Sequence, residues 1–420
     1  MKNKILDIFK ENLTVKISIV LILLFPIALM AGSAIINLFI VLMNITFLIH
    51  IFKEKKFQVF NNDISYLLFI LWAFLILNTL LNGDFKENYS RSFGFIRFLL
   101  LVFSLSYFLS YKQFKYKKVI FNIWSIIFLI VTFDLIFELY FGFNTFGFDN
   151  KYYGRLSSFM GEDLKIGHWY LCFSLIALSN NFKRNKTFFV LILLSIIISF
   201  FIGERANFIR LFIAVFFLAL ITRHLTFKNL GILTILIIFM TLMIGNSKSG
   251  SNMHVMKGKF MDQFISLIVK HDSIKELNNS NLYTPMYVNA YNLFKENKLL
   301  GIGVGTYLEK SHEIFRKHKQ INGYKLLPNT HPHQYHFEIL ATIGLPGYIV
   351  IFLFLLYFFY KSFCFYMLNK EIVNLSSLIL LLVMCLPLLP TGSFFTTFGA
   401  SIFWLNFSLM NLGNFKNINY

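Results

Sequence analysis

The chain has 420 residues, of which 57% are hydrophobic and 14% charged, and its formal net charge is +19. Soluble domains carry about 25% charged residues, so the composition excludes a soluble enzyme and a disordered chain. The three cysteines, Cys172, Cys364 and Cys385, lie in or beside apolar stretches, which argues against a disulfide framework and a cysteine-rich zinc site.

Apolar runs of about 20 residues, long enough to cross a bilayer, recur along the chain. They predict an all-α, polytopic integral membrane protein with about 12 transmembrane helices in a single membrane domain, 1–420. The first run resembles a signal peptide, but Asp7 and Glu11 in the leader and a second apolar run directly after it favour an uncleaved span. The expected spans are 13–32, 33–52, 63–83, 93–111, 118–143, 166–180, 186–203, 206–222, 228–245, 340–360, 372–390 and 396–413.

The basic residues sort by side of the membrane. With a cytoplasmic N-terminus, the inner segments hold 18 Lys and Arg, whereas the short outer loops hold six. This bias follows the positive-inside rule. Most of the basic excess therefore indicates orientation, with both termini in the cytoplasm, and no nucleic acid partner is expected.

One segment, 246–335, is about 90 residues long without a full span, and it lies between the ninth and tenth spans. Parity places it in the periplasm. It holds 12 Lys and Arg against 6 Asp and Glu, and long ordered loops usually carry function. Apolar residues at helical spacing within 260–268 and 286–294 predict two amphipathic helices, which either lie on the membrane face or pack the loop.

The loop ends in the densest polar cluster of the chain, 329–338. Pro332 keeps His331 extended and is well placed near a helix start. His333, at the outer end of a membrane helix, is accessible to a lipid-linked substrate and can take a proton at neutral pH. The pattern alone leaves open a general base, a structural interfacial histidine and, less favoured, a metal site that includes His336.

Three arginines are expected at the outer ends of spans: Arg155, Arg205 and Arg210. Arg210 lies about 7.5 Å deeper than Arg205, where burial costs about 2.5–3.5 kcal/mol unless the guanidinium meets a partner or water. Arginine binds phosphate bidentately, so the set suits a diphosphate carried on a lipid. Snorkelling, or pairing with Glu204, is an equally open interpretation for each.

The glycine-rich stretch 299–307 resembles a nucleotide loop only superficially. It lacks a Lys-Ser/Thr pair and a βαβ context. A tight backbone turn in the loop is the better interpretation.

Several blocks, in the expected order, resemble the O-antigen ligase family, and the similarity covers 150–350. His333-Gln334, followed after nine residues by Gly344 and Gly347, matches the ligase pattern of His-Asn/Ser/Gln and Gly-x-x-Gly. The other blocks are His331-Pro332-His333, Asn297 to Gly305, Arg155 to Gly167, and Gly203 to Ala206. Lys298 departs from the usual proline.

The resemblance implies a glycosyltransferase of the cell inner membrane that needs no metal and no cofactor. Its donor would be a polyprenyl-diphosphate-linked glycan, and its acceptor a sugar hydroxyl of lipid A-core, on the periplasmic face. The family pattern implies His333 as the catalytic base, and the expected diphosphate ligands are Arg155, Arg205 and Arg210. Supporting roles are expected for His331, Gln334, Glu338, Gly344 and Gly347.

Three other functions remain open. A Wzy-type polymerase uses the same donor chemistry with another lipid-linked glycan as acceptor. A protein O-oligosaccharyltransferase shares the fold but usually carries extra C-terminal soluble sequence. A transporter would bind the diphosphate without chemistry, but repeated halves and broken helices in matching positions, which are typical of transporters, are not found.

Overall fold

In a computed structural model of the chain, residues 7–8, 10–82, 85–149, 154–161, 163–224, 231, 283–321, 323–387 and 389–415 are described. The elements up to residue 224 are α2 (Leu13–Met30), α3 (Ser33–Glu54), η1 (Phe57–Phe60), α4 (Asp63–Asn82), α5 (Phe85–Gly94), α6 (Ile96–Phe114), α7 (Lys117–Phe141), η2 (Ser158–Met160), α8 (Ile166–Asn181), α9 (Asn185–Phe201) and α10 (Arg205–Ile221). The later elements are α15 (Thr284–Glu296), α16 (Tyr307–Lys317), β1 (Gln320–Ile321), β2 (Tyr324–Lys325), α17 (Tyr335–Asn369), α18 (Ile372–Met384), α19 (Thr397–Met410) and η4 (Leu412–Phe415).

The prediction of a mostly helical membrane protein is confirmed. A helix forms at each expected span that falls on described residues. Within the described part, six helices are long and apolar enough to cross a membrane, and α9, α18 and α19 are shorter apolar helices. The expected span 228–245 lies outside the described residues, so the count of twelve stays a prediction.

Two details of the sequence-based prediction are corrected. The chain is not purely α-helical, because β1 and β2 form a small antiparallel hairpin that pairs Gln320 with Lys325. The expected span 372–390 ends at Met384. The chain beyond it contains Pro387 and Pro390, and proline cannot continue a helix because it lacks the N–H and clashes with the preceding turn.

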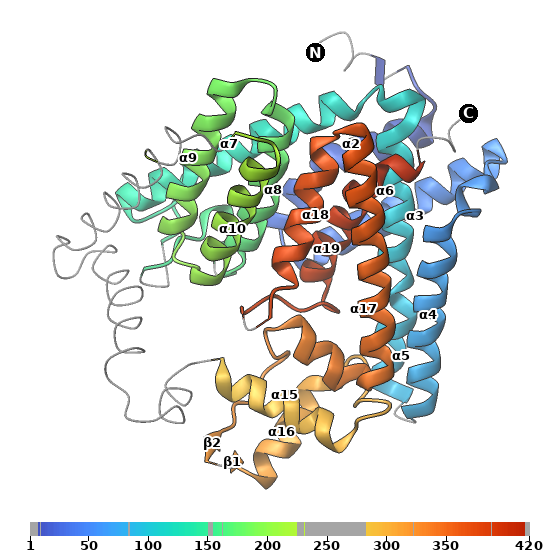
Figure 1. Cartoon of the computed structure of the whole chain (residues 1–420), viewed down its shortest axis with the longest axis vertical. Helices are drawn as coiled ribbons and strands as arrows, with labels where there is room; N and C mark the ends of the chain where they lie inside the picture. Colours follow the sequence, from blue (N-terminus) through green and yellow to red (C-terminus); the bar gives the residue numbers. More distant parts are fainter. Residues whose placement is uncertain are drawn as a thin grey trace.

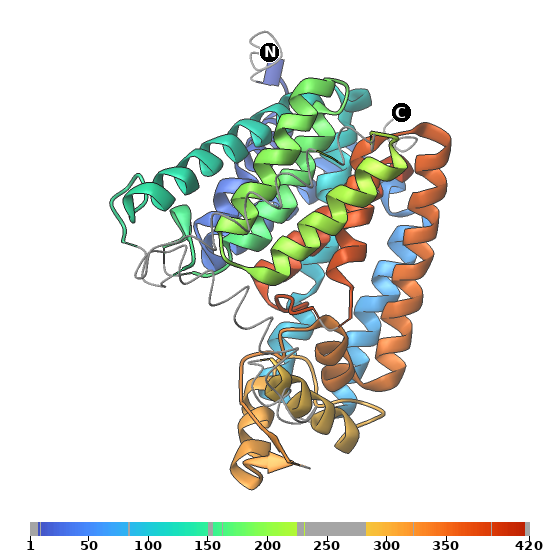
Figure 2. The ribbon, with the colours of Figure 1, turned by 60° about the vertical axis from the view of Figure 1, so that its left-hand side comes forward.

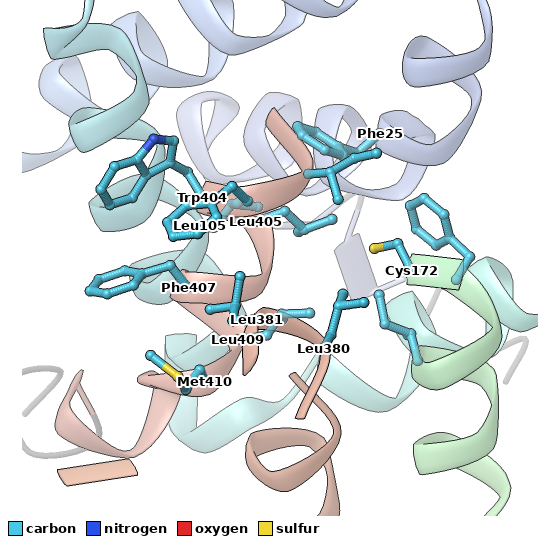
Figure 3. Packing of buried hydrophobic residues seen from close by; sticks show 14 of the residues in the cluster. Phe25, Leu105, Cys172, Leu380, Leu381, Trp404, Leu405, Phe407, Leu409 and Met410 are labelled. Carbon is cyan, nitrogen blue, oxygen red and sulfur yellow. The ribbon is translucent and has the colours of Figure 1, made fainter. Parts of the chain in front are cut away.

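The hydrophobic core is centred on α19, which is buried on every side from Phe398 to Met410. A helix that is apolar all round belongs in the interior. Figure 3 shows Trp404 and Leu405 of this helix packing with Leu105 of α6, Leu380 of α18 and Cys172 of α8. This packing brings the start of α8 and the ends of α18 and α19 into one framework.

The described part of the large loop gathers at one end of the bundle. Figures 1 and 2 show α15, α16 and the hairpin together beside the beginning of α17. In α15, Met286, Ala290 and Leu293 are buried, which confirms the second expected amphipathic helix. The first, 260–268, lies outside the described residues. The sequence did not predict α16, whose sequence is mostly polar.

The expected continuous span 340–360 is instead interrupted. Gly344 has φ +71° and ψ −176°, so α17 consists of a short piece, 335–343, and a long piece, 345–369. The glycine-rich turn docks on this break: Ile302 N–H donates to Ala341 O (2.9 Å), Gly303 N–H to Thr342 O (2.8 Å) and Leu345 N–H to Lys298 O (2.8 Å). The turn thereby pairs backbone groups that a helix break leaves free.

Glycine is required on both sides of that contact. A Cβ on Gly344 would collide with the backbone of Leu299, and a Cβ on Gly301 would collide with the backbone of Thr342. Both residues also have positive φ, a region that other residues enter at a cost of about 1–2 kcal/mol. The predicted role of 299–307 as a tight backbone turn is confirmed, and its binding partner is the break in α17.

Candidate active site

His333 stands at the entrance to the short piece of α17, in an unusual backbone conformation. Its φ is +54°, which is rare for a residue with a side chain and is often found at functional sites. The conformation is held from both sides. The carbonyl of His333 accepts a hydrogen bond from Thr391 N–H (2.7 Å), and Gln334 caps the helix because its side chain accepts from Phe337 N–H (3.1 Å).

The His333 ring has two aromatic neighbours. Its centroid lies 4.1 Å from the ring of His331 and 5.8 Å from the ring of Tyr283 on α15. The Nε2 atom of His331 is buried without a hydrogen-bond partner among the described residues. A buried, unpaired ring nitrogen beside His333 is unusual.

Both rings are poor proton acceptors compared with an exposed histidine. Burial, together with the neighbouring groups His333 and Lys165, lowers the pKa of His331 to about 3. Burial also lowers the pKa of His333, while a hydrogen bond with the Thr391 backbone raises it in part. Both histidines are therefore neutral at pH 7, the protonation state that a general base requires.

A segment between α18 and α19, residues 391–394, connects the parts of the site through hydrogen bonds. We call it the strap. Its backbone is held at three places, by His333 and by residues of two helices. Thr391 N–H bonds His333 O, Gly392 N–H donates to Nε2 of His168 at the start of α8 (3.1 Å), and Phe394 N–H donates to Glu338 Oε2 of α17 (2.7 Å). Ser393 Oγ also donates to Glu338.

The role expected for Glu338 as a supporting residue now has a definite form in the structure. The carboxylate is buried and accepts from the strap. Because a buried acceptor left unpaired costs about 1–3 kcal/mol, these bonds fix the strap against α17, the helix that begins two residues after His333.

His168 is a site residue that the sequence analysis missed. Its Nδ1 lies 3.0 Å from Asn207 Nδ2 and 3.8 Å from Glu204 Oε2. Glu204 also accepts from Gly167 N–H (3.2 Å) and from Asn207 Nδ2 (2.5 Å). The block 203–206 had been noted only for Arg205, so the sequence held a signal for Glu204 but none for His168.

Arg155 is placed beside this cluster. Leu156 N–H donates to Ile202 O (3.2 Å), and a Cβ on Gly203 would collide with the carbonyl of Gly154. The loop of Arg155 therefore lies directly on the turn that carries Glu204. The guanidinium is close enough that its charge acts on both Glu204 and His168.

The far side of the Arg155 loop is anchored on two buried carboxylates of α7. Glu138 accepts from the backbone N–H groups of Ser157 (3.0 Å) and Ser158 (2.7 Å). Asp134 accepts from Ser158 Oγ (2.5 Å). This loop is thus pinned on both sides, which limits the positions open to Arg155.

Arg210 faces inward, but its guanidinium is already engaged. The side chain is 1% exposed, and it donates to Val383 O (3.2 Å), Leu389 O (2.9 Å) and Asn207 Oδ1 (3.2 Å). Arg210 thereby ties α10 to the end of α18. A direct contact with a diphosphate would require some of these hydrogen bonds to be given up.

Arg205 is not brought into the cluster. It is exposed, and helical spacing places it on the same face of α10 as Ile209 and Phe216, which are 40% and 39% exposed. The buried face of α10 instead carries Asn207 and Arg210. The two arginines that the sequence grouped together therefore point to different surroundings.

His336 also separates from the other histidines. Its Nε2 lies 2.7 Å from Cys385 O and its Nδ1 lies 3.0 Å from the Tyr348 hydroxyl, so both ring nitrogens are engaged with protein groups. Within the described ranges, no group of three or more His, Cys, Asp and Glu is arranged to hold a metal ion.

An apolar cavity of about 190 Å³ adjoins this end of α17. It lies between α17 and α18 and includes Tyr335, two residues from His333. Phe352, Leu356 and Leu382 in its wall are each more than 40% exposed, so the cavity is continuous with the apolar outer surface of the bundle.

Comparison with known proteins finds one family that part of this chain resembles. Comparison with curated proteins finds no match. A family profile described as O-antigen ligase matches residues 171–352, a stretch that includes His333, Arg205, Arg210 and the glycine-rich turn. Arg155, His168 and the strap lie outside the matched stretch. Over this stretch, which is less than half of the chain, the sequence is similar to the O-antigen ligase family.

Proposed function

We propose that the chain transfers a glycan from a polyprenyl-diphosphate carrier to a sugar hydroxyl of an acceptor, lipid A-core in the first instance. The reaction takes place at the end of the bundle that carries α15 and α16, facing the periplasm from the inner membrane. The match of residues 171–352 to the O-antigen ligase profile supports the reaction class. The three-to-one excess of Lys and Arg on the opposite side supports the orientation.

His333 acts as the general base. Its neutral ring accepts the proton of the acceptor hydroxyl as the oxygen attacks the anomeric carbon of the donor. The bond between that carbon and the phosphate oxygen breaks, and polyprenyl diphosphate leaves with the electron pair. The imidazolium then returns its proton to water. The diphosphate is a good leaving group, so no nucleotide is consumed.

Arg155 contacts the diphosphate in this proposal. It is the arginine whose charge reaches the His168 and Glu204 cluster, and the starts of α8 and α10 lie in the same region, where helix N-termini favour anions. Arg205, on the outward face of α10, meets the phosphates as the carrier approaches from the membrane. Arg210 acts mainly by holding α10 to α18.

The apolar cavity between α17 and α18 holds the first part of the polyprenyl chain. Its wall opens on the membrane-facing surface and reaches Tyr335. A lipid can therefore enter sideways while its diphosphate stays near the site. Burying apolar chain in such a cavity is favourable by about 0.8 kcal/mol per CH₂ group.

The single observation that carries the proposal is the backbone conformation and the surroundings of His333. A neutral histidine is held in a left-handed conformation by the strap, beside a second neutral histidine with an unpaired Nε2. Strain of this kind is a known feature of catalytic positions, whereas a protein that only binds or moves a lipid diphosphate has no need of a fixed neutral base.

The test is a pair of alanine variants, expressed in a strain that lacks the gene. His333→Ala should abolish surface glycan attachment while the protein still inserts in the membrane. His312→Ala, which removes an exposed histidine of α16, is the matched control and should complement fully. Glycan attachment by the His333→Ala variant at the control's level would remove the base assignment.

A Wzy-type polymerase is the second candidate, because the same family covers both. The products that accumulate in the gene-deletion strain distinguish them. Long glycan on the lipid carrier indicates a ligase. Single repeat units on the carrier or on lipid A-core indicate a polymerase, and unmodified protein acceptors would indicate a protein O-oligosaccharyltransferase.

A further inference from the structure

α15 joins the proposed active site to a second, polar pocket. At its beginning, Tyr283 packs 5.8 Å from the His333 ring, and one turn later Tyr287 stacks on Phe337 at 5.1 Å. At its end, Glu296 and Asn297 enter the wall of a pocket. The helix has 13 residues, so these ends are about 18–20 Å apart at 1.5 Å per residue.

This pocket differs in character from the apolar cavity near Tyr335. Its volume is about 310 Å³. It is formed where the end of α4, the end of α15, the glycine-rich turn and α16 meet. The residues that line it are Asn82, Leu293, Glu296, Asn297, Gly301, Ile302, Lys310, Glu313, Ile314 and Lys317.

Its walls are fixed by backbone contacts. Asn82 Nδ2 donates to Asn78 O (3.0 Å) and to Leu300 O (3.3 Å), which ties α4 to the glycine-rich turn. Ile302 N–H donates to Ala341 O (2.9 Å), which ties the turn to α17. The pocket therefore exists before any ligand arrives, and a preformed site spends less free energy on ordering.

Hydrogen-bonding groups remain available inside it. The side-chain amides of Asn82 and Asn297 are oriented by bonds from their Nδ2 atoms, and no described residue donates to their Oδ1 atoms. The side chains of Glu296 and Lys317 likewise make no hydrogen bond or ion pair within the described part of the chain. Lys310 and Glu313 face each other at 3.2 Å.

The balance of these groups selects a ligand class. Two carboxylates and two ammonium groups cancel, so the lining offers no net charge to a phosphate or to a nucleic acid. Carboxylate and amide oxygens accept from hydroxyl groups, and ammonium groups donate to ether and carbonyl oxygens. Leu293, Ile302 and Ile314 supply an apolar surface for C–H groups. A sugar has both features, since it carries many hydroxyl groups and an apolar face of C–H groups.

We propose that this pocket is a second glycan subsite, which holds a sugar distant from the reacting one while transfer takes place at His333. The inference rests on the proposed function and specifies its substrate. A single sugar at His333 cannot span the length of α15, whereas a glycan of several sugars can. The enzyme therefore distinguishes long chains from short ones, on the donor or on the acceptor.

The test uses two double variants of equal charge change. Glu296→Ala with Lys317→Ala removes two pocket groups, while Glu309→Ala with Arg316→Ala removes two exposed groups of α16 outside the pocket. The probes are glycans released from the organism's own cell surface by mild acid, separated into single repeat units and chains of four or more. Each is added as a competitor of transfer in proteoliposomes, and its binding is measured by saturation-transfer NMR.

In the wild type and in the α16 control, long glycan should compete and bind well, and single units weakly. In the pocket variant, the inhibition constant and Kd of the long fraction should rise about tenfold, with the single unit unchanged. A rise in the KM of the donor alone places the donor glycan in the pocket, and a rise in the KM of the acceptor alone places the acceptor there.

Equal competition by long glycan in the two double variants overturns the subsite. That failure is distinct from failure of the proposed function. The proposed function fails when His333→Ala retains transfer, and the NMR measurement of glycan binding does not depend on transfer.

Discussion

Where α6 meets α7, and at the far end of α17, acidic side chains pair with lysines. Lys112 lies 2.8 Å from Glu11, Lys117 lies 2.7 Å from Glu371, and Lys361 lies 3.0 Å from Asp63. Near His333, three acidic side chains are buried and bond backbone N–H groups instead: Glu338 holds the strap, Glu204 holds Gly167, and Glu138 holds the Arg155 loop.

The difference lies in what each carboxylate fixes. An exposed ion pair constrains two flexible side chains and contributes about 0–1 kcal/mol. A buried carboxylate that accepts from backbone N–H groups constrains a loop, and its removal leaves those donors unpaired. The ion pairs with lysines therefore constrain little of the backbone, while the buried carboxylates near His333 hold loops in a fixed geometry.

The largest expected effect is at the break in α17. Gly344→Ala introduces a collision with Leu299 in addition to an unfavourable φ, and we expect a destabilisation of about 2–5 kcal/mol with loss of transfer. Gly142→Ala is the control, because Gly142 also has positive φ but nothing lies near its missing Cβ. Thermal unfolding in detergent should separate them, and equal losses would mean that the docked turn contributes nothing.

The comparison between the two ends is tested most directly by isosteric amide variants. Glu338→Gln places an amide donor against Phe394 N–H and should cost about 1–3 kcal/mol. Asp63→Asn removes the charge partner of Lys361, at a side chain that is 59% exposed, and should cost about 0–1 kcal/mol. Unfolding midpoints give both values. Similar costs would contradict the distinction between the ends.

His168 should affect rate more than binding. His168→Ala removes the acceptor of Gly392 N–H and frees the strap that holds His333, and a displacement of about 1 Å at a catalytic group costs on the order of 10²-fold in rate. We expect a fall of about 10–100-fold in kcat with KM nearly unchanged. His168→Gln, which keeps an acceptor, should restore part of it. A change in KM alone would instead make His168 a substrate-binding residue.

The smallest effect concerns pH. Because the pKa of His333 lies below its usual value of 6.5, the unfolded chain takes up this proton first, so stability is flat above pH 6.5 and falls below it. Transfer depends on the folded protein and falls only at lower pH, as the pH passes through the lowered pKa of His333. Glu11 behaves differently. Burial raises its pKa, but hydrogen bonds from Lys112 and Tyr116 outweigh that and leave it below 4.5. Its contribution is therefore lost only in strong acid.

The kinetic profile of transfer between pH 5 and 8, with unfolding measured over the same range, checks this order. An acid limb of transfer above pH 6.5 would contradict the burial of His333. His331 also has a lowered pKa, so the His333→Ala variant should keep part of the loss of stability below pH 6.5. A loss as large as that of the wild type would assign the proton to another group.

Local pattern was sufficient for much of the fold. Apolar runs located the helices, the stripe of Met286, Ala290 and Leu293 located α15, and the glycines of 299–307 indicated a turn. The His-Pro-His block indicated the start of α17. Each of these depends on residues close together in the chain, where spacing translates directly into geometry.

The parts that sequence could not provide are contacts between distant segments. His168 and Gly392 are 224 positions apart, and no periodicity connects them. From the sequence, Gly344 was simply a small residue inside the expected span 340–360. The helix break at Gly344 could not be predicted, because its contact, Leu299, lies in another segment. Arg205 and Arg210 looked equivalent in the sequence. In α10, however, the five-residue spacing puts Arg210 on the buried face and Arg205 on the exposed face.

The break at Gly344 divides α17 into two parts that pack against different segments. The long piece, 345–369, belongs to the bundle, and in a thicker or thinner bilayer it is free to change tilt as membrane helices do. The short piece, which begins two residues after His333, is joined to α15, the glycine-rich turn and the strap. His333 is therefore insulated from changes in the tilt of the long piece, and transfer should vary little between membranes of different thickness.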